Sequence, residues 1–188
     1  MNSRLEWDTH IDSIATRANR ALAFLRRNLR VQSKAVKEKA YKAFARPVLE
    51  YAASVWEPYS KTQIDKLEAV QRRAARFVSG DYRYSSSVSK MLMDLKWPTL
   101  QQRRRRIRLA TTFKIQNDVM HCPLIKSKPT PAPDRQQRTH NRQLNRVTAL
   151  TEYGANAFLP RTVTELNDLP APVVYASSVN IFVCYLPP

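Results

Sequence analysis

Apolar residues recur every three or four positions along much of the chain, which is the spacing of one face of an α-helix. The first such run follows Asp8, whose side chain suits an N-cap, so a helix is predicted from this residue onward. Its apolar face consists of Ile11, Ile14, Ala18, Leu22, Leu25 and Leu29. No clean alternation typical of β-strands occurs, and the chain has only two glycines, which argues against a turn-rich β fold. The pattern therefore predicts an all-α protein.

Residues 33–80 predict two amphipathic helices that meet at a corner rich in aromatic residues and proline. The first helix contains Pro47, which has no backbone N–H group, so a kink or a break is expected near Ala43. Its predicted buried face consists of Val36, Ala40, Ala43, Phe44, Val48, Tyr51, Ala52 and Val55. Tyr51 is accordingly expected to be buried between the two helices.

The second helix of this pair is expected to begin at Ser60, because Ser60 and Gln63 have the spacing of a capping box. Gly80 is expected to end it, since glycine readily adopts the left-handed conformation. Its predicted buried face consists of Ile64, Leu67, Val70, Ala74, Phe77 and Val78.

A short helix over residues 88–95 and a long helix from Thr99 onward complete the predicted bundle of about five helices. Thr99 and Gln102 repeat the spacing of a capping box. The predicted buried positions of the long helix are Leu100, Ile107, Ala110, Phe113 (or the aliphatic part of Lys114) and Val119.

The composition changes after residue 121. Residues 126–146 are rich in proline and polar residues and nearly free of large apolar side chains, which predicts a linker or an extended arm. Apolar residues return from Val147 and predict a small helical appendage. The expected organisation is thus a helical bundle over residues 1–121, a linker over 122–148 and an appendage over 149–188.

Charge is the outstanding property of the composition, because 32 Lys and Arg face 15 Asp and Glu, for a net charge of +17. Up to residue 121 there are 25 basic and 11 acidic side chains, whereas residues 122–188 hold 7 and 4. The first helix alone exposes Arg17, Arg20, Arg26, Arg27 and Arg30. Such a field favours polyanions, with nucleic acid preferred over an anionic membrane.

The candidate phosphate-binding residues are arginines, whose guanidinium groups donate paired hydrogen bonds to phosphate. They lie on the second helix, in the loop between Tyr82 and Tyr84, and on the first turns of the long helix. The candidates are Arg72, Arg73, Arg76, Arg83, Arg103, Arg104, Arg105, Arg106 and Arg108. A solvated helix face and a nuclear-import sequence are the alternative interpretations of the arginines in the long helix.

No catalytic, metal or cofactor site is predicted. The cysteines, Cys122 and Cys184, lack the spacing of a zinc site or a disulfide framework, and His10, His121 and His140 add no ligand motif. The chain has no glycine-rich phosphate loop. No apolar run reaches the ~20 residues of a membrane helix, and charges occupy the N-terminus where a secretory signal needs apolar residues. We therefore expect an intracellular protein, nuclear or cytoplasmic.

Two runs of sequence resemble a known family. Residues 40–59 read AYKAFARPVLEYAASVWEPY and residues 64–78 read IDKLEAVQRRAARFV. Both closely resemble the C-terminal part of reverse transcriptases from LINE-type (non-LTR, jockey-like) retrotransposons. Further matches are LEWDTHI at 5–11, LRRNL at 25–29, LKWPTLQQRR at 95–104 and TELNDLP at 164–170, where the family more usually has Trp in place of Leu166.

The resemblance implies the thumb and the region after it, which in the parent enzyme would hold the RNA template and its DNA primer against the palm. The family's paired catalytic carboxylates have no counterpart in this chain, which contains no Asp-Asp pair. We therefore expect a non-catalytic fragment that binds RNA, DNA or an RNA–DNA hybrid through phosphates, without sequence preference. The alternative is an inactive remnant or a protein-interaction module with no nucleic-acid role.

Overall fold

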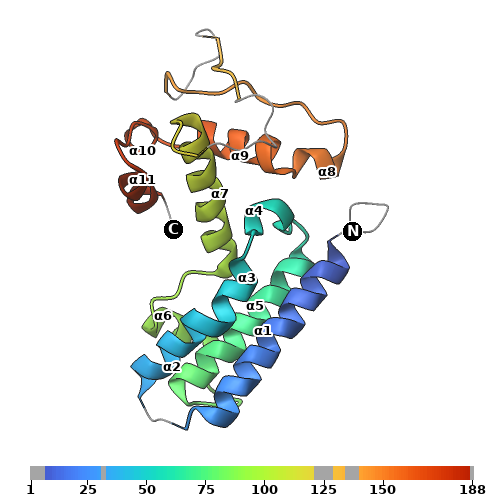
Figure 1. The fold of residues 1–188 in the computed structure, drawn as a ribbon, viewed down its shortest axis with the longest axis vertical. Helices are drawn as coiled ribbons and strands as arrows, with labels where there is room; N and C mark the ends of the chain where they lie inside the picture. The colour runs from blue at the N-terminus through green and yellow to red at the C-terminus, as the bar shows by residue number, and fades with distance from the viewer. Residues whose placement is uncertain (1–6, 31–32, 121–128, 134–139, 187–188) are drawn as a thin grey trace. The chain divides into compact units, whose positions relative to one another are not determined.

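The computed structural model describes residues 7–30, 33–120, 129–133 and 140–186, and most of them are helical (Figure 1). No β-strand occurs among these residues, whose β-type pairing is a single bridge between Pro131 and Leu144. The prediction of an all-α protein is confirmed. The chain divides into two compact units, residues 1–104 and 105–188. The division thus falls inside the long helix, whereas the sequence suggested a boundary at residue 121.

Helix α1 (Asp8–Asn28) buries the predicted face. Its buried residues are Ile11, Ile14, Ala18, Leu22 and Leu25. The prediction that Asp8 caps the helix is wrong, since the N-cap position is Trp7 and Asp8 lies in the first turn. The Asp8 carboxylate instead accepts a hydrogen bond from Gln63 Nε2 at 2.5 Å.

The segment with Pro47 comprises α2 (Lys34–Ala40), the π-helical turn η1 (Tyr41–Ala45), α3 (Arg46–Glu50) and α4 (Ala53–Trp56). A proline nitrogen cannot donate to the carbonyl four residues earlier, and a wider π-turn directly precedes Pro47. The predicted disturbance near Ala43 is confirmed in this form. A full break follows at Ala52, whose φ of 50° lies in the left-handed region.

The predicted buried face of this segment is wrong at most positions, although Ala40 and Val48 are half-buried and pack against the core. Tyr51 is 81% exposed and Phe44 is 65% exposed, and Val36 and Val55 are exposed as well. The buried residues are Tyr41, Ala45, Leu49, Ala53 and Trp56. Apolar residues occupy two neighbouring stripes of the helical surface, both with four-residue spacing, and periodicity alone cannot choose between them.

Helix α5 (Lys61–Ser79) ends at Gly80, whose φ of 69° is left-handed as predicted. Its buried face includes the predicted residues Leu67, Val70, Ala74, Phe77 and Val78. Ile64 is half-buried. The capping box at its start is not formed. Ser60 Oγ forms a hydrogen bond with Thr62 Oγ1, and Gln63 Nε2 donates a hydrogen bond to Asp8 Oδ1 of α1.

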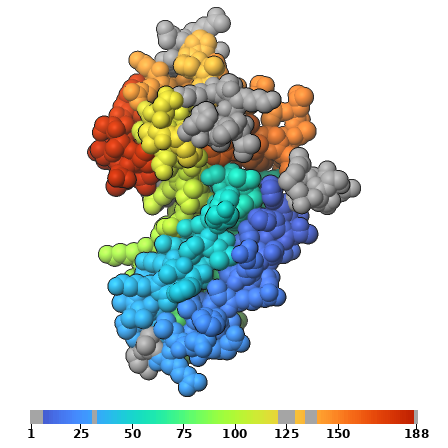
Figure 2. All heavy atoms as spheres, in the orientation of Figure 1, coloured from blue at the N-terminus to red at the C-terminus, as the bar shows by residue number. Residues whose placement is uncertain are grey.

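In the N-terminal unit, α1 and α5 run parallel to each other and α3 packs against α1 (Figure 1). Residues of α1 and of the α2–α4 segment adjoin on the face seen in Figure 2. Two buried clusters form the core. One consists of Ile11, Ile14, Ala18, Leu49, Ala53, Trp56, Leu67, Val70 and Leu100. The other consists of Leu22, Leu25, Tyr41, Ala45, Ala74, Phe77 and Val78.

Helices α6 (Val88–Asp94) and α7 (Leu100–Gln116) follow as predicted. The capping box of α7 is confirmed, because Thr99 N donates to Gln102 Oε1 at 2.9 Å and Gln102 N donates to Thr99 Oγ1 at 3.1 Å. The buried stripe of α7 is only partly as predicted: Leu100 and Phe113 are buried, whereas Val119 is exposed and lies beyond the helix. The further buried residues are Arg104, Arg108, Leu109, Thr112 and Ile115.

The C-terminal unit contains the rest of α7 together with α8 (Glu152–Ala155), α9 (Phe158–Asn167), α10 (Ala171–Val174) and α11 (Val179–Tyr185). Its core consists of Leu109, Phe113, Leu144, Val163, Leu166, Leu169, Val173, Val174, Ala176, Phe182 and Leu186.

Part of the predicted linker is packed into the C-terminal unit. Leu144 is buried, and its N–H donates to Asn167 Oδ1 while Asn167 Nδ2 donates to the Leu144 carbonyl, both at 2.8 Å. His140 and Gln143 are buried beside it. Residues 122–128 and 134–139 of the predicted linker, including Cys122, lie outside the described residues, as does His121 at the end of the predicted bundle. The described 140–145 stretch therefore forms an extended arm held by side-chain hydrogen bonds.

Candidate nucleic-acid interface

The structure separates the nine candidate arginines into groups. Arg72, Arg73 and Arg83 are exposed on the N-terminal unit, and Arg76 is half-exposed. Arg103, Arg105 and Arg106 are half-buried on α7. Arg104 and Arg108 are each only 1% exposed.

The contacts between α1 and α5 change in character along the two helices. Near the start of both helices the contacts pair unlike groups, as in the ion pair between Lys66 Nζ and Asp12 Oδ1 at 2.7 Å. Two turns further on, Arg73 Nη1 donates to Asn19 Oδ1 at 3.1 Å, so a neutral amide faces the cation. Positive charge therefore accumulates toward the C-terminal ends of the pair.

The loop after α5 continues this arrangement. The guanidinium of Arg26 lies 4.8 Å from the centroid of the Tyr82 ring, and Arg76 Nη1 donates to the Arg83 carbonyl at 2.9 Å. We call the resulting region the α1/α5 basic surface. It consists of Arg26, Arg27, Arg72, Arg73, Arg76, Arg83 and Tyr82.

Asp81 fixes the shape of this loop. Its carboxylate accepts hydrogen bonds from Arg83 Nη2 at 3.1 Å, from the Arg83 backbone N–H at 3.0 Å and from Ser86 Oγ at 2.6 Å. These hydrogen bonds, that of the Arg83 side chain first, hold the pKa of the Asp81 carboxyl well below its usual range. Tyr84 in the same loop is completely exposed. The loop thus presents an ordered arginine and an accessible aromatic ring.

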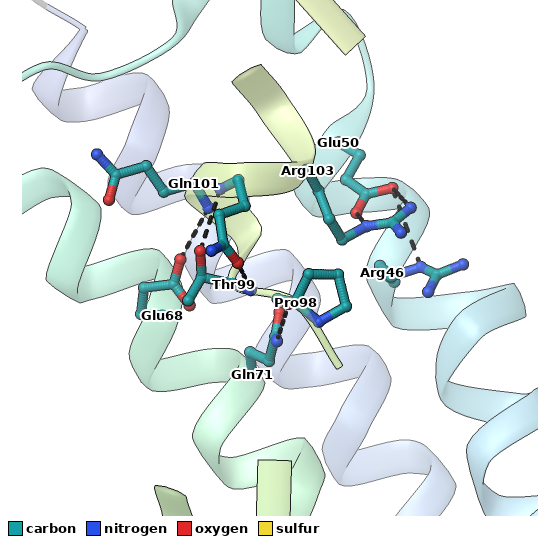
Figure 3. A network of polar contacts seen from close by, with 9 residues as sticks. Arg46, Glu50, Glu68, Gln71, Pro98, Thr99, Gln101 and Arg103 are labelled. Atoms are coloured by element: carbon teal, nitrogen blue, oxygen red, sulfur yellow. Dashed lines mark hydrogen bonds and ion pairs between the residues drawn. The ribbon is translucent and has the colours of Figure 1, made fainter. Parts of the chain in front are cut away.

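Arg103, a candidate phosphate-binding residue, is engaged within the protein. Arg103 forms a two-point ion pair with Glu50, in which Nη2 lies 3.0 Å from Oε2 and Nε contacts Oε1 (Figure 3). Arg46 Nε also lies 3.9 Å from Glu50 Oε2. Because Glu50 comes from α3, this contact ties the start of α7 to the helix that carries Pro47.

Neighbouring polar contacts strengthen the same junction in the N-terminal unit. The backbone N–H of Gln101 donates to Glu68 Oε1 at 2.9 Å, and Gln71 Nε2 donates to the Pro98 carbonyl at 2.8 Å (Figure 3). Together with Arg103, these groups are used within the protein and are not directed at a ligand.

Arg104 and Arg108, two further candidate phosphate-binding residues, are buried and do not lie on the surface of α7. The four-residue spacing of Leu100, Arg104, Arg108 and Thr112 places both arginines on the buried stripe of the helix. Arg108 Nη2 lies 2.5 Å from Glu165 Oε1. A buried guanidinium needs such a carboxylate, because an uncompensated buried charge is strongly destabilising.

Glu165 gathers three arginines of the C-terminal unit. Besides Arg108, it pairs with Arg105 at 3.0 Å and with Arg161 at 3.5 Å. Burial raises the pKa of the Glu165 carboxyl, but the charge of Arg108 and the hydrogen bonds from Arg108 and Arg105 outweigh burial, so that this pKa is lowered. Sequence analysis missed this residue, because nothing in the spacing connects α9 with arginines 57 and 60 residues earlier.

Replacing Glu165 by Gln should lower the stability of the C-terminal unit by about 1–2 kcal/mol at pH 7, a value reduced for partial exposure of the pairs. The lowered pKa means that ionised Glu165 stabilises the fold above its ordinary pKa of 4.5, and that this stabilisation is lost as the pH falls through the folded-state pKa. Amide hydrogen exchange of Val163 and Leu166 at several pH values measures the difference in stability between the parent and the variant. The exposed Glu152→Gln is the control, and a difference that stays constant down to pH ~2 would contradict the role of the charge.

An apolar groove lies elsewhere on the N-terminal unit, between α1 and the α3–α4 corner. Its volume is about 520 Å³, and its lining includes Trp7, Pro47, Tyr51, Val55 and Trp56. His10, which lies between the Trp7 and Trp56 rings at 5.5 and 5.6 Å, also lines it. The predicted interhelical position of Tyr51 is thus a groove wall that solvent reaches.

Within the described parts of the chain, no three His, Cys, Asp or Glu side chains converge in an arrangement for a metal ion. None of the described helices has the length and apolar character needed to cross a membrane.

Comparisons of the chain with protein-family models, with curated proteins and with solved structures found no match.

Proposed function

We propose that the chain is a non-catalytic nucleic-acid-binding module that contacts the phosphates of RNA, DNA or an RNA–DNA hybrid without sequence preference. The observation that carries the proposal is the α1/α5 basic surface. Six arginines from two parallel helices and one loop make up this surface, and among them Arg83 pairs with the carboxylate of Asp81. Clustered arginines of this kind are the usual electrostatic footprint of nucleic-acid binding.

The geometry suits a phosphate backbone better than a base edge. Arg26 and Arg73 project from separate helices whose contacts keep them at fixed positions, so they can meet successive phosphates along a strand. The exposed ring of Tyr84 offers a face on which an unpaired base can stack, a contact that every base makes. Both features support affinity without sequence preference.

The resemblance to LINE-type reverse transcriptases supports the same function. A thumb holds template and primer while another domain performs the chemistry, and this chain contains no Asp-Asp pair for a two-metal site. In this proposal the N-terminal unit is the thumb-like bundle, and the C-terminal unit is the smaller appendage. Its place of action is the nucleus or the cytoplasm, where nucleic acid is found.

Replacing Arg26, Arg73 and Arg83 together with Ala should weaken the binding of duplex DNA and of RNA alike. Three lost phosphate contacts should reduce the slope of log affinity against log salt by about three. The exposed positions of these residues mean that the thermal unfolding midpoint should hardly change. Fluorescence anisotropy with labelled duplexes at several salt concentrations measures both affinity and slope.

A matched control removes three positive charges from outside the α1/α5 basic surface. Lys39, Lys61 and Lys90 are all exposed and lie outside the α1/α5 basic surface. Their joint replacement by Ala should change the affinity much less than the arginine variant does. Equal losses in the two variants would mean that only net charge matters and would remove the proposed interface.

A protein-interaction module is the second candidate function, and the apolar groove beside Tyr51 is the observation that favours it. Two of its lining residues, Tyr51 and Val55, are largely exposed although apolar. The anisotropy measurement separates the candidates, because a module without a nucleic-acid role would bind neither DNA nor RNA at low salt.

A further inference from the structure

A small cavity lies in the N-terminal unit beside the π-turn, away from the contacts that define the α1/α5 basic surface. Its volume is about 130 Å³. The side chains that matter here are those of Tyr41, Lys42, Arg46, Lys96 and Arg103. The cavity thus brings four cationic side chains and one phenol to a single place.

Tyr41 is the unusual member of the lining. It is 1% exposed, and its ring stacks on Trp97 with centroids 4.8 Å apart. Its hydroxyl has no hydrogen-bond partner among the residues that the structure describes. A buried hydroxyl without a partner is costly and calls for an explanation, for which a bound ligand is one common answer.

The Tyr41 hydroxyl remains protonated and available as a donor. Burial is the main cause that raises the pKa of this phenol, and the charge of Glu50 raises it further. The charges of Arg46 and Arg103 lower this pKa and that of Glu68 raises it, with burial outweighing them all. Tyr41, Arg46 and Arg103 line the same cavity.

The charges around the cavity do not cancel. Lys42 pairs with Glu38 at 2.5 Å, and both oxygens of Glu50 are engaged by Arg103. Arg46 reaches Glu50 only at 3.9 Å. The charge of Glu68 also acts on the Tyr41 phenol, so four cations face three carboxylates, and the excess of one positive charge favours an anion.

Lys96 lines the cavity from the end of α6. Its φ of 52° is in the left-handed region, which is unfavourable for a residue with a long side chain. Glycine would adopt this conformation without strain. The conformation belongs to the end of α6, where Trp97 N donates to the Leu92 carbonyl at 3.0 Å and Lys96 N donates to the Met93 carbonyl at 2.9 Å. It leaves the Lys96 side chain in the lining of the cavity.

We propose that this cavity binds a single phosphate group, with Arg46 and Lys96 as the charged ligands and the Tyr41 hydroxyl as a hydrogen-bond donor. Four water-sized oxygens occupy about 120 Å³ at about 30 Å³ each, which the cavity can accommodate. A free phosphate ion and the terminal phosphate of a nucleotide chain present the same chemistry. The site does not depend on nucleic-acid binding at the α1/α5 basic surface.

The test is a titration of the full chain with inorganic phosphate, in which NMR monitors the signal of the Trp97 indole N–H. This N–H donates to Glu38 Oε1 at 2.9 Å, and the Trp97 ring stacks on Tyr41, so it reports on the cavity. The indole signal should shift and saturate with phosphate but not with sodium chloride of equal ionic strength. A linear shift that is the same for both salts would overturn the proposal.

Two variants separate binding from folding. Tyr41→Phe should weaken phosphate binding about tenfold while leaving the thermal unfolding midpoint unchanged or higher, because it removes an unsatisfied buried group. Lys96→Gly should weaken binding and raise the midpoint, since it relieves the left-handed lysine. The exposed Lys90→Gln should change neither property. If Lys96→Gly binds phosphate as tightly as the parent, the proposal is wrong.

A further arm identifies the source of the phosphate. A short oligonucleotide with a 5′-phosphate is compared with the same oligonucleotide ending in a 5′-hydroxyl. Saturation of the Trp97 shift by the phosphorylated form alone supports recognition of a chain end. Saturation by inorganic phosphate but by neither oligonucleotide supports a site for the small anion.

Discussion

Raising the sodium chloride concentration from about 50 to about 200 mM should weaken the binding of duplex DNA about a thousandfold. Each phosphate contacted on B-DNA contributes about 0.9 to the slope of log affinity against log salt. The α1/α5 basic surface offers six arginines, so about six contacts and a slope near −5 are expected. Anisotropy titrations of the full chain, with the magnesium-free buffer unchanged except for salt, measure the slope directly.

The same experiment has a clear negative outcome. A flat response to salt, or no binding at about 50 mM salt, would remove the proposed function, because exposed cations must release counterions when they meet phosphates. A slope near −2 would instead mean that most of the six arginines do not touch the nucleic acid. Comparison of DNA, RNA and hybrid duplexes tests whether the binding depends on the kind of strand.

Replacing Leu49 by Ala should lower the free energy of unfolding of the N-terminal unit by about 2–5 kcal/mol, the range for leucine-to-alanine changes in cores. Leu49 is completely buried in the cluster with Ile11, Trp56 and Leu67. The matched control is Tyr51→Ala, only two positions away. Because Tyr51 is largely exposed, its replacement should change the free energy by no more than about 0.5 kcal/mol.

Urea unfolding followed by tryptophan fluorescence measures both variants, since Trp7, Trp56 and Trp97 all belong to the N-terminal unit. A large loss of stability in Tyr51→Ala, with little effect of Leu49→Ala, would restore the buried stripe suggested by the sequence. That outcome would reject the orientation of α3 seen in the structure.

The helices that sequence analysis placed well have one apolar stripe each. In α5, Leu67, Val70 and Ala74 lie on a single face with charged residues opposite, so the buried side was unambiguous. The α2–α4 segment has two adjacent apolar stripes, and a π-turn and a left-handed Ala52 alter its helical register. Packing against α1 and α5 determines which stripe is buried. The local sequence does not predict this tertiary packing.

The candidate arginines divide for a related reason. The exposure of Arg72, Arg73 and Arg83 follows from their position opposite the apolar face or in a polar loop. The burial of Arg108 depends on Glu165, which is 57 residues away in the sequence. The contact of Arg26 with Tyr82 likewise joins residues that are distant in the sequence. This part of the candidate interface could therefore not be predicted from the sequence.

The parallel orientation of α1 and α5 has an electrostatic consequence for the proposed interface. A helix carries a macrodipole equivalent to about half a negative elementary charge at its C-terminal end. Two parallel helices therefore place about one full negative charge at the same end. Arg26 and Arg27 lie in the last turn of α1, and Arg76 lies in the last turn of α5. Part of their positive charge is therefore offset by the helix ends, and the potential that an approaching phosphate meets is lower than a count of arginines implies.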